Sequence, residues 1–115
     1  MNRKVSVAPM MDCTDRHERF FLRLISKNTL LYSEMVVSEA IHRGDKKKLL
    51  EFNINEKPIA LQIGGSSPAL LAEATKAGED FGYDEINLNL GCPSKKVEKN
   101  KFCLLYTSDA ADDSL

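Results

Sequence analysis

The chain has 115 residues, of which 43% are hydrophobic and 29% are charged, and its formal net charge is −1. This balance is typical of a folded globular domain and argues against a disordered chain. No apolar run approaches the roughly 18 residues that a membrane-spanning helix needs, and no secretory signal is evident, so we expect no membrane partner. Three sparse cysteines without metal-ligand spacing argue against a disulfide framework and a metal site, and they indicate a reducing, cytoplasmic location.

The first part of the chain predicts a strand followed by a helix. Residues 4–8 form a short apolar strand that Pro9 ends, and a loop follows. Asp15, with Glu18 three residues later, resembles the capping box that begins a helix. The apolar stripe of this helix and its arginines should lie on different faces. The stripe contains Phe20, Phe21, Leu24 and Ile25, and the arginines are Arg16, Arg19 and Arg23.

Strands and helices continue to alternate along the rest of the chain. A second strand is predicted over residues 30–35, and a short helical stretch follows near 38–42. Residues 58–63 predict a third strand, and Ser67 is a good N-cap for the next helix. Residues 84–90 alternate apolar and polar side chains, which is the pattern of a fourth strand.

This alternation indicates an α/β fold with parallel strands and crossover helices. A doubly wound open sheet and a (β/α)8 barrel both fit, and both place active residues at the carboxyl ends of strands. No glycine-rich dinucleotide fingerprint follows the first strand, which disfavours the open sheet. Polar residues on the inward strand faces favour the barrel, namely Gln62 on the third strand and Asn87 and Asn89 on the fourth. Because a full barrel needs about 250 residues, we expect the first half of a truncated TIM barrel with about four parallel strands.

The fourth strand leads into a turn in which Cys92 stands between a glycine and a proline. Asn87 and Asn89 on one face of this strand need partners, because an unpaired buried amide is costly. Loops at strand ends often carry function. The pattern alone leaves two interpretations open, a reactive cysteine and a structural loop cysteine.

Three separated motifs resemble the tRNA-dihydrouridine synthases. They are residues 7–15 (VAPMMDCTD), 60–65 (ALQIGG) and 86–94 (INLNLGCPS). Residues 15–32 resemble the A-type bacterial subfamily in particular. The resemblance covers roughly residues 4–102, and the order of the three motifs makes it far more specific than any one of them.

The resemblance implies an FMN-containing barrel enzyme that reduces selected uridines of tRNA to dihydrouridine, with NADPH as electron donor. It also implies a role for particular residues of this chain. The cofactor would be held by Pro9, Met10, Met11 and Gln62, the substrate nucleotide would meet Asn89, and Cys92 would be the catalytic proton donor.

The residue types suit this chemistry. Hydride reaches one carbon of the uracil double bond, and the adjacent carbon must then receive a proton. A thiol, with a free pKa of about 8.5, is a suitable acid near neutral pH. An asparagine amide both donates and accepts, so it can hold a uracil edge. The base must also leave the RNA stack to reach a barrel mouth.

Other polar residues have simpler interpretations. We expect Cys13 to be a small loop hydrophobe and His17 and His42 to be surface or packing residues. Two groups of lysines stand apart. Lys46, Lys47 and Lys48 predict a solvated face, whereas Lys95, Lys96, Lys99 and Lys101 could contact RNA phosphates or form a solvated helix.

Residues 1–102 are therefore expected to form the N-terminal half of an FMN-binding TIM-barrel domain. Residues 103–115 depart from the family pattern and are expected to be a non-native, adapter-like tail. A half barrel would lack the later strands and the tRNA-binding domain, so we expect the chain as given to be inactive. Two other functions stay open, a non-catalytic flavin- or RNA-binding module and another FMN barrel oxidoreductase acting on a small molecule.

Overall fold

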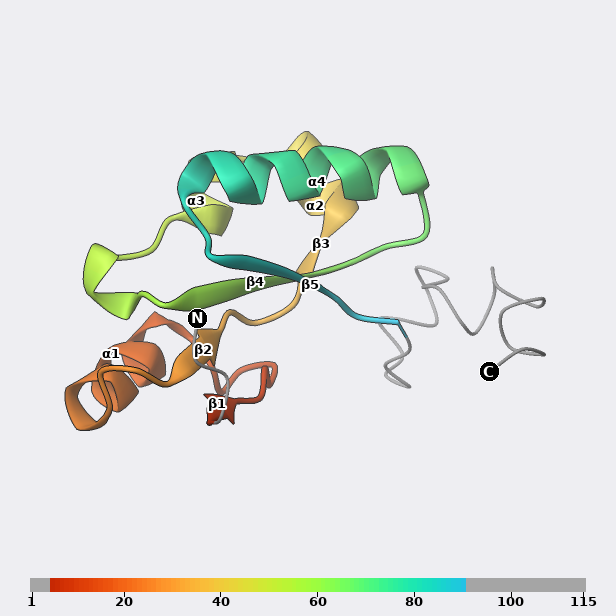
Figure 1. Cartoon of the computed structure of the whole chain (residues 1–115). Helices are drawn as coiled ribbons and strands as arrows, with labels where there is room; N and C mark the ends of the chain where they lie inside the picture. Colours follow the sequence, from red (N-terminus) through yellow and green to blue (C-terminus); the bar gives the residue numbers. More distant parts are fainter. Residues whose placement is uncertain (1–4, 91–115) are drawn as a thin grey trace.

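The structure is a computed structural model that describes residues 5–90, and these form one parallel sheet with its helices (Figure 1). The strands are β1 (Ser6–Val7), β2 (Leu30–Tyr32), β3 (Val36–Val37), β4 (Ile59–Gly64) and β5 (Glu85–Leu88). The helices are α1 (Arg16–Ile25), α2 (Ser38–Arg43), α3 (Lys46–Leu50), η1 (a 3-10 turn, Ile54–Glu56) and α4 (Pro68–Phe81). Every recorded strand pair is parallel, so the predicted α/β fold is confirmed. The predicted 103–115 tail lies outside the described residues.

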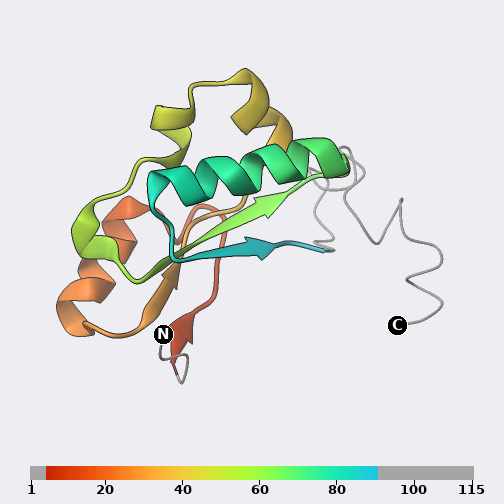
Figure 2. The same cartoon turned by 45° about the horizontal axis from the view of Figure 1, so that its top comes forward.

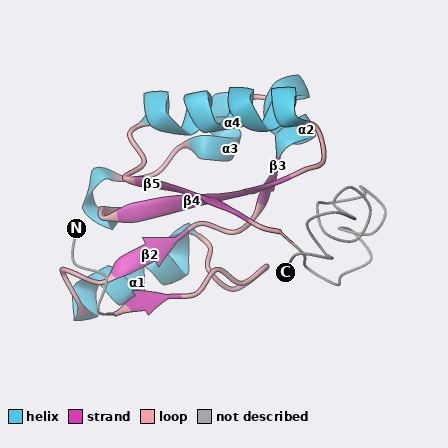
Figure 3. Cartoon of the chain, turned by 45° about the vertical axis from the view of Figure 1, so that its right-hand side comes forward, coloured by secondary structure: helices cyan, strands magenta, loops and turns pink. Residues whose placement is uncertain are grey.

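Strand β4 lies at the centre of the sheet. It pairs with β2 and β3 along one edge and with β5 along the other, and β1 extends the sheet beyond β2. All six residues of β4 are buried. Helices α2, α3 and α4 lie over β4 and β5 (Figure 2), whereas α1 lies beside β1 and β2 (Figure 3).

The main core lies between β4 and the helices over it. Its buried members are Ile41, Leu50, Leu61, Ile63, Ala74 and Ala77. Gly78 lets α4 approach the sheet closely, because an added Cβ would lie 2.6 Å from Ile86 Cδ1 and 2.8 Å from Leu61 Cδ2. The odd-numbered residues of β4 therefore face α4. By the two-residue period of a strand, Ala60 and Gln62 face the opposite side of the sheet.

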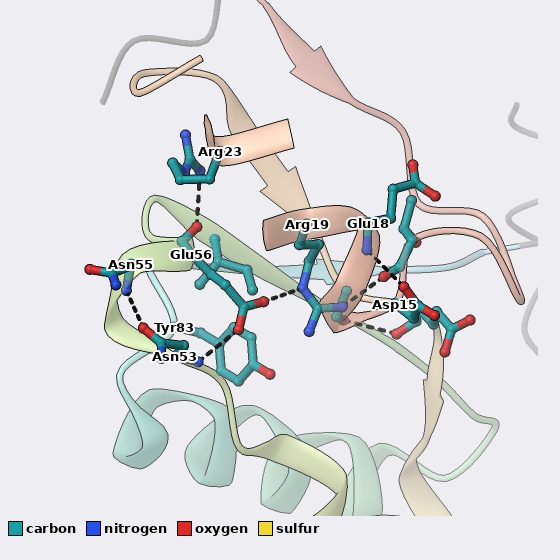
Figure 4. A network of polar contacts seen from close by, with 12 residues as sticks. Asp15, Glu18, Arg19, Arg23, Asn53, Asn55, Glu56 and Tyr83 are labelled. Atoms are coloured by element: carbon teal, nitrogen blue, oxygen red, sulfur yellow. Dashed lines mark hydrogen bonds and ion pairs between the residues drawn. The ribbon is translucent and has the colours of Figure 1, made fainter. Parts of the chain in front are cut away.

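The predicted helix starts are confirmed. Asp15 Oδ1 accepts a hydrogen bond from Glu18 N at 2.9 Å, and Ser67 Oγ accepts one from Leu70 N at 3.3 Å (Figure 4 shows the first). Each side chain satisfies one of the amide groups that a helix leaves unpaired at its start. Helix α4 ends where Gly82 adopts a left-handed conformation with φ 96°, which a glycine tolerates without strain.

The predicted second strand is divided by a one-residue bulge. Tyr32 pairs with Ala60 and Val36 pairs with Ile63, so four steps along β2 and β3 match three steps along β4. Ser33 repairs the interrupted ladder: its N–H donates to the Ala60 carbonyl at 2.9 Å, and its Oγ accepts from Gln62 N at 3.1 Å. A side-chain hydroxyl thus replaces the backbone carbonyl that the bulge displaces.

Helix α1 turns its arginine face, and not its apolar face, toward the rest of the molecule. An apolar stripe usually faces the core, but here the stripe residues are 53–71% exposed and Arg19 is 7% exposed. The stripe consists of Phe20, Phe21, Leu24 and Ile25.

Buried acceptors explain this orientation of α1. Arg19 Nε lies 2.5 Å from Glu56 Oε1, and Arg19 Nη1 donates to the Thr14 carbonyl at 2.6 Å (Figure 4). Arg23 Nη2 donates to the carbonyls of Glu56 and Pro58 at 2.9 and 3.0 Å. A buried carboxylate left without its cation would be far more costly than an exposed apolar side chain.

We predict that the exposed α1 face makes the purified chain self-associate, because it is a contiguous apolar surface. The double variant Phe21→Lys/Leu24→Lys should shift the chain toward monomer in analytical ultracentrifugation. Its free energy of unfolding should change by only about 0.5 kcal/mol per site, because both side chains are exposed.

Ile54→Lys is the matched control, since Ile54 is 72% exposed and lies in η1, outside the apolar stripe of α1. This control should associate as the unsubstituted chain does. An unsubstituted chain that stays monomeric over the whole concentration range would contradict the prediction.

Candidate functional site

Two polar side chains meet on the sheet face opposite α4. The register places Gln62 of β4 beside Asn87 of β5, and Gln62 Nε2 donates to Asn87 Oδ1 at 2.9 Å. The sequence prediction that these residues share a polar face is therefore confirmed. Gln62 is 9% exposed, so its polar atoms need partners.

The carbonyl oxygen of the Gln62 side chain is an unused hydrogen-bond acceptor among residues 5–90. Within residues 5–90 its Oε1 accepts no hydrogen bond, whereas its Nε2 is bonded to Asn87. The paired strands on both sides and the bond from Gln62 N to Ser33 Oγ fix its backbone. Gln62 thus offers a carbonyl oxygen from a rigid position, which suits recognition of a ligand N–H group.

The loop after β1 displays two methionines at the carboxyl end of that strand. Thr14 closes the loop on Met10: Met10 N donates to Thr14 Oγ1 at 3.0 Å, and Thr14 Oγ1 and N donate to the Met10 carbonyl at 3.1 and 3.0 Å. Asp12 takes the left-handed region with φ 63°, which aspartate tolerates better than most residues. Met10 and Met11 remain exposed and Pro9 is half-buried.

Asn89 is anchored just beyond the end of β5. Its N–H donates to the Ile63 carbonyl at 2.9 Å, which continues the pairing with β4. The two-residue period puts Asn89 on the same strand face as Asn87. Cys92, the predicted proton donor, lies outside the described residues, as do the lysines at positions 95, 96, 99 and 101. The structure therefore places Met10, Met11, Gln62 and Asn89 at the carboxyl ends of β1, β4 and β5, and the role of Cys92 stays a prediction.

A second polar layer lies one step earlier along the same strands. The register aligns Tyr32, Ala60 and Glu85, and Tyr32 Oη lies 3.4 Å from Glu85 Oε1. Glu85 continues the alternation of Asn87 and Asn89 toward the start of β5. This alternation could have indicated from the sequence that three consecutive inward positions of the strand are polar.

Sequence reasoning missed two residues that shape the site. Thr14 holds the methionine loop, and Ser33 completes the hydrogen bonding of Gln62. Both are buried hydroxyl residues. Thr14 had a local signal, because Ser and Thr side chains often bond backbone groups four residues away. Ser33 had none, because its partner is 29 residues distant.

A separate hollow of the described residues lies away from Gln62. A cavity of about 490 Å³ opens beside α1, and it is lined by residues that include Arg19, Glu34, Glu56 and Tyr83. Its lining contains neither Gln62 nor the two exposed methionines. Its charges are of both signs and its deepest pair, Arg19 and Glu56, is already joined, so it is not the candidate site.

Residues 5–90 contain no group of metal ligands and no helix that could cross a membrane. No three His, Cys, Asp or Glu side chains in this part of the chain stand close enough to hold a metal ion. No helix there combines the length and the apolar character that crossing a bilayer requires.

Known proteins that this chain resembles carry the name of one enzyme family. The family model described as dihydrouridine synthase matches residues 6–115. A Synechocystis sp. protein named tRNA-dihydrouridine(20/20a) synthase is 56% identical over 107 residues, covering 91% of this chain and 32% of the relative. Proteins of the same name from Pseudomonas aeruginosa and Escherichia coli are 53% and 54% identical, covering 91% and 96% of this chain and 32% of each relative. The chain thus spans about a third of the length of these relatives.

We predict that Ser33→Ala destabilises the chain by about 1–3 kcal/mol, the cost of leaving a buried N–H without an acceptor. The free energy of unfolding in urea measures this. Ser6→Ala is the control, because Ser6 is exposed in β1 and its loss should cost no more than about 0.5 kcal/mol. Equal losses for the two variants would show that the hydroxyl does not support Gln62.

A separate prediction concerns Tyr83, whose Oη donates to the Leu50 carbonyl at 2.9 Å. Burial raises the pKa of Tyr83 to about 12. The charge of nearby Arg19 lowers this pKa, and the charge of Glu56 raises it. An unfolded tyrosine titrates near pH 10, and the raised pKa favours the neutral, folded form. This contribution to stability is complete below about pH 10 and is lost as the pH rises from about 10 to 12.

Titration of tyrosinate absorbance tests this among the three tyrosines of the chain. One step should appear near pH 12 and should vanish in Tyr83→Phe. Three tyrosines that titrate together near pH 10 would show that Tyr83 is not buried as described.

Proposed function

The chain belongs to the dihydrouridine synthase family, and we propose that a full-length protein carrying it reduces uridine in tRNA to dihydrouridine with FMN and NADPH. The fold of the family is a TIM barrel, and this chain covers a part of it. The relatives that match it are named tRNA-dihydrouridine(20/20a) synthases. A tRNA substrate would also account for the expected cytoplasmic location.

One observation carries this proposal: residues of all three motifs stand at the carboxyl ends of parallel strands in one sheet. Met10 and Met11 follow β1, Gln62 lies near the end of β4, and Asn89 follows β5. In barrels, this edge is where substrates and cofactors bind.

The residues described fit a flavin. A flavin has an apolar face and a polar edge, and the chain offers matching groups for both. Two exposed methionines supply soft, polarisable surface, and Gln62 Oε1 supplies an acceptor without a partner in residues 5–90. We propose that Pro9, Met10, Met11 and Gln62 hold FMN.

When bound, FMN would supply hydride to one carbon of the uracil double bond. The chain's own part is to hold the base and to deliver a proton to the adjacent carbon. We assign the first task to Asn89, whose amide can both donate to and accept from a uracil edge. We assign the second to Cys92, whose thiol gives up its proton as the carbon–hydrogen bond forms, leaving a thiolate that solvent reprotonates.

We predict that Cys92→Ala in the full-length protein slows dihydrouridine formation by roughly 100- to 10,000-fold, the usual contribution of a general acid. Single-turnover reactions with pre-reduced flavin isolate this step from reduction by NADPH. Cys13→Ala is the matched control, because Cys13 is an exposed loop cysteine, and it should react as the unsubstituted protein does.

Unchanged turnover in Cys92→Ala would remove Cys92 as proton donor. NADPH oxidation that proceeds equally well without tRNA would instead favour an oxidoreductase acting on a small molecule. Absence of any turnover with FMN bound would favour a non-catalytic flavin-binding module.

A further inference from the structure

We propose that Asn87 is a positioning residue that sets the amide orientation of Gln62, so that Gln62 presents its carbonyl oxygen, and not its NH2 group, to the flavin. This inference rests on the proposed function, because it takes the ligand of Gln62 to be FMN. The observation behind it is the hydrogen bond from Gln62 Nε2 to Asn87 Oδ1 at 2.9 Å.

The backbone of Gln62 has little freedom. Leu61 and Ile63 on either side are fully buried against the helices, and the strand is paired on both edges. The Gln62 N–H is held by Ser33 Oγ at 3.1 Å. Only the side-chain torsions of Gln62 remain adjustable, so a contact at its amide decides what it presents to a ligand.

Asn87 is placed to make that contact. Its position opposite Gln62 is set by a four-residue register between β4 and β5. With its Oδ1 accepting from Nε2, the Gln62 amide has its donor side engaged and its acceptor side available. Within residues 5–90, no other side chain bonds the Gln62 amide.

The orientation matters because glutamine's two amide groups have opposite polarity. A carbonyl oxygen can accept from the N–H of a flavin ring. An NH2 group in the same place would set one donor against another. A glutamine that is free to turn over would spend part of its time in the wrong orientation, and apparent affinity falls with the fraction of the binding-competent form.

FMN affinity of the full-length protein, measured by fluorescence titration, tests the proposal. Asn87→Leu keeps the shape and removes the acceptor, and it should raise the FMN Kd about tenfold, as expected for a lost hydrogen bond of roughly 1.4 kcal/mol. Asn87→Asp can only accept, so it enforces the orientation in the structure and should leave the Kd within about threefold of the unsubstituted value.

The decisive arm repeats Asn87→Leu in a Gln62→Glu background. Both oxygens of a carboxylate accept, so this background has no amide orientation to lose. Asn87→Leu should then change the FMN Kd by less than about twofold. The same tenfold loss in both backgrounds would show that Asn87 acts only through general packing and would overturn the proposal. A loss in Asn87→Asp equal to that in Asn87→Leu would also overturn it.

Circular dichroism and Tm check that each variant folds, and Asn87→Ala replaces Asn87→Leu if the latter does not. Asn55→Leu is the surface control and should leave the FMN Kd unchanged, because Asn55 is exposed in η1. No FMN binding by the unsubstituted protein would overturn the proposed function and this inference together. FMN binding that is indifferent to Asn87 would overturn this inference alone.

Discussion

The pairing of β4 on both edges is the constraint on which the positions of the site residues depend. This strand takes β2 and β3 along one edge and β5 along the other, and two of these neighbours contribute to the polar face, β2 with Tyr32 and β5 with Asn87. The extra residue between β2 and β3 would leave the N–H of Gln62 without an acceptor, and Ser33 supplies one. Bulges often lie next to functional sites because they re-aim side chains. Here the bulge permits a second run of pairing that extends the sheet to Gly64, level with the start of the loop that follows.

Much of this arrangement was predictable because it depends on local patterns. The alternation of strands and helices predicted the parallel sheet, and helix starts followed from Asp15 and Ser67. The two-residue period of β4 and β5 predicted that Gln62 and Asn87 face the same side of the sheet, and the register pairs them. The bulge was not predictable in the same way. The bulge arises because residues 32–36 take one step more than residues 60–63 of β4, with which they pair. The sequence of residues 30–37 alone does not show how they will pair with β4.

Helix α1 is a different case: its apolar stripe is clear in the sequence, but the sequence pattern predicted the wrong face as buried. Its apolar stripe is real, yet the buried face is set by Arg19, whose partner Glu56 is 37 residues away. Periodicity measures how side chains are distributed around one helix, and it carries no information about a distant buried carboxylate. Once Glu56 is enclosed, separating it from Arg19 would leave a buried charge unpaired, at a cost of about 3–5 kcal/mol.

Polar contacts hold the residues of the candidate site, whereas apolar packing stabilises the main core on the other face of the sheet. The core over β4 is built from apolar residues of α2, α3 and α4, on the face opposite Gln62. The site face is held instead by hydroxyl and amide groups, with Thr14 on the methionine loop, Ser33 on the backbone of Gln62 and Asn87 on its side chain. Hydrogen bonds are directional, so they define where an atom points more narrowly than apolar packing does. Volume-conserving changes in the core can therefore be tolerated while the orientation of the amides on the other face stays the same.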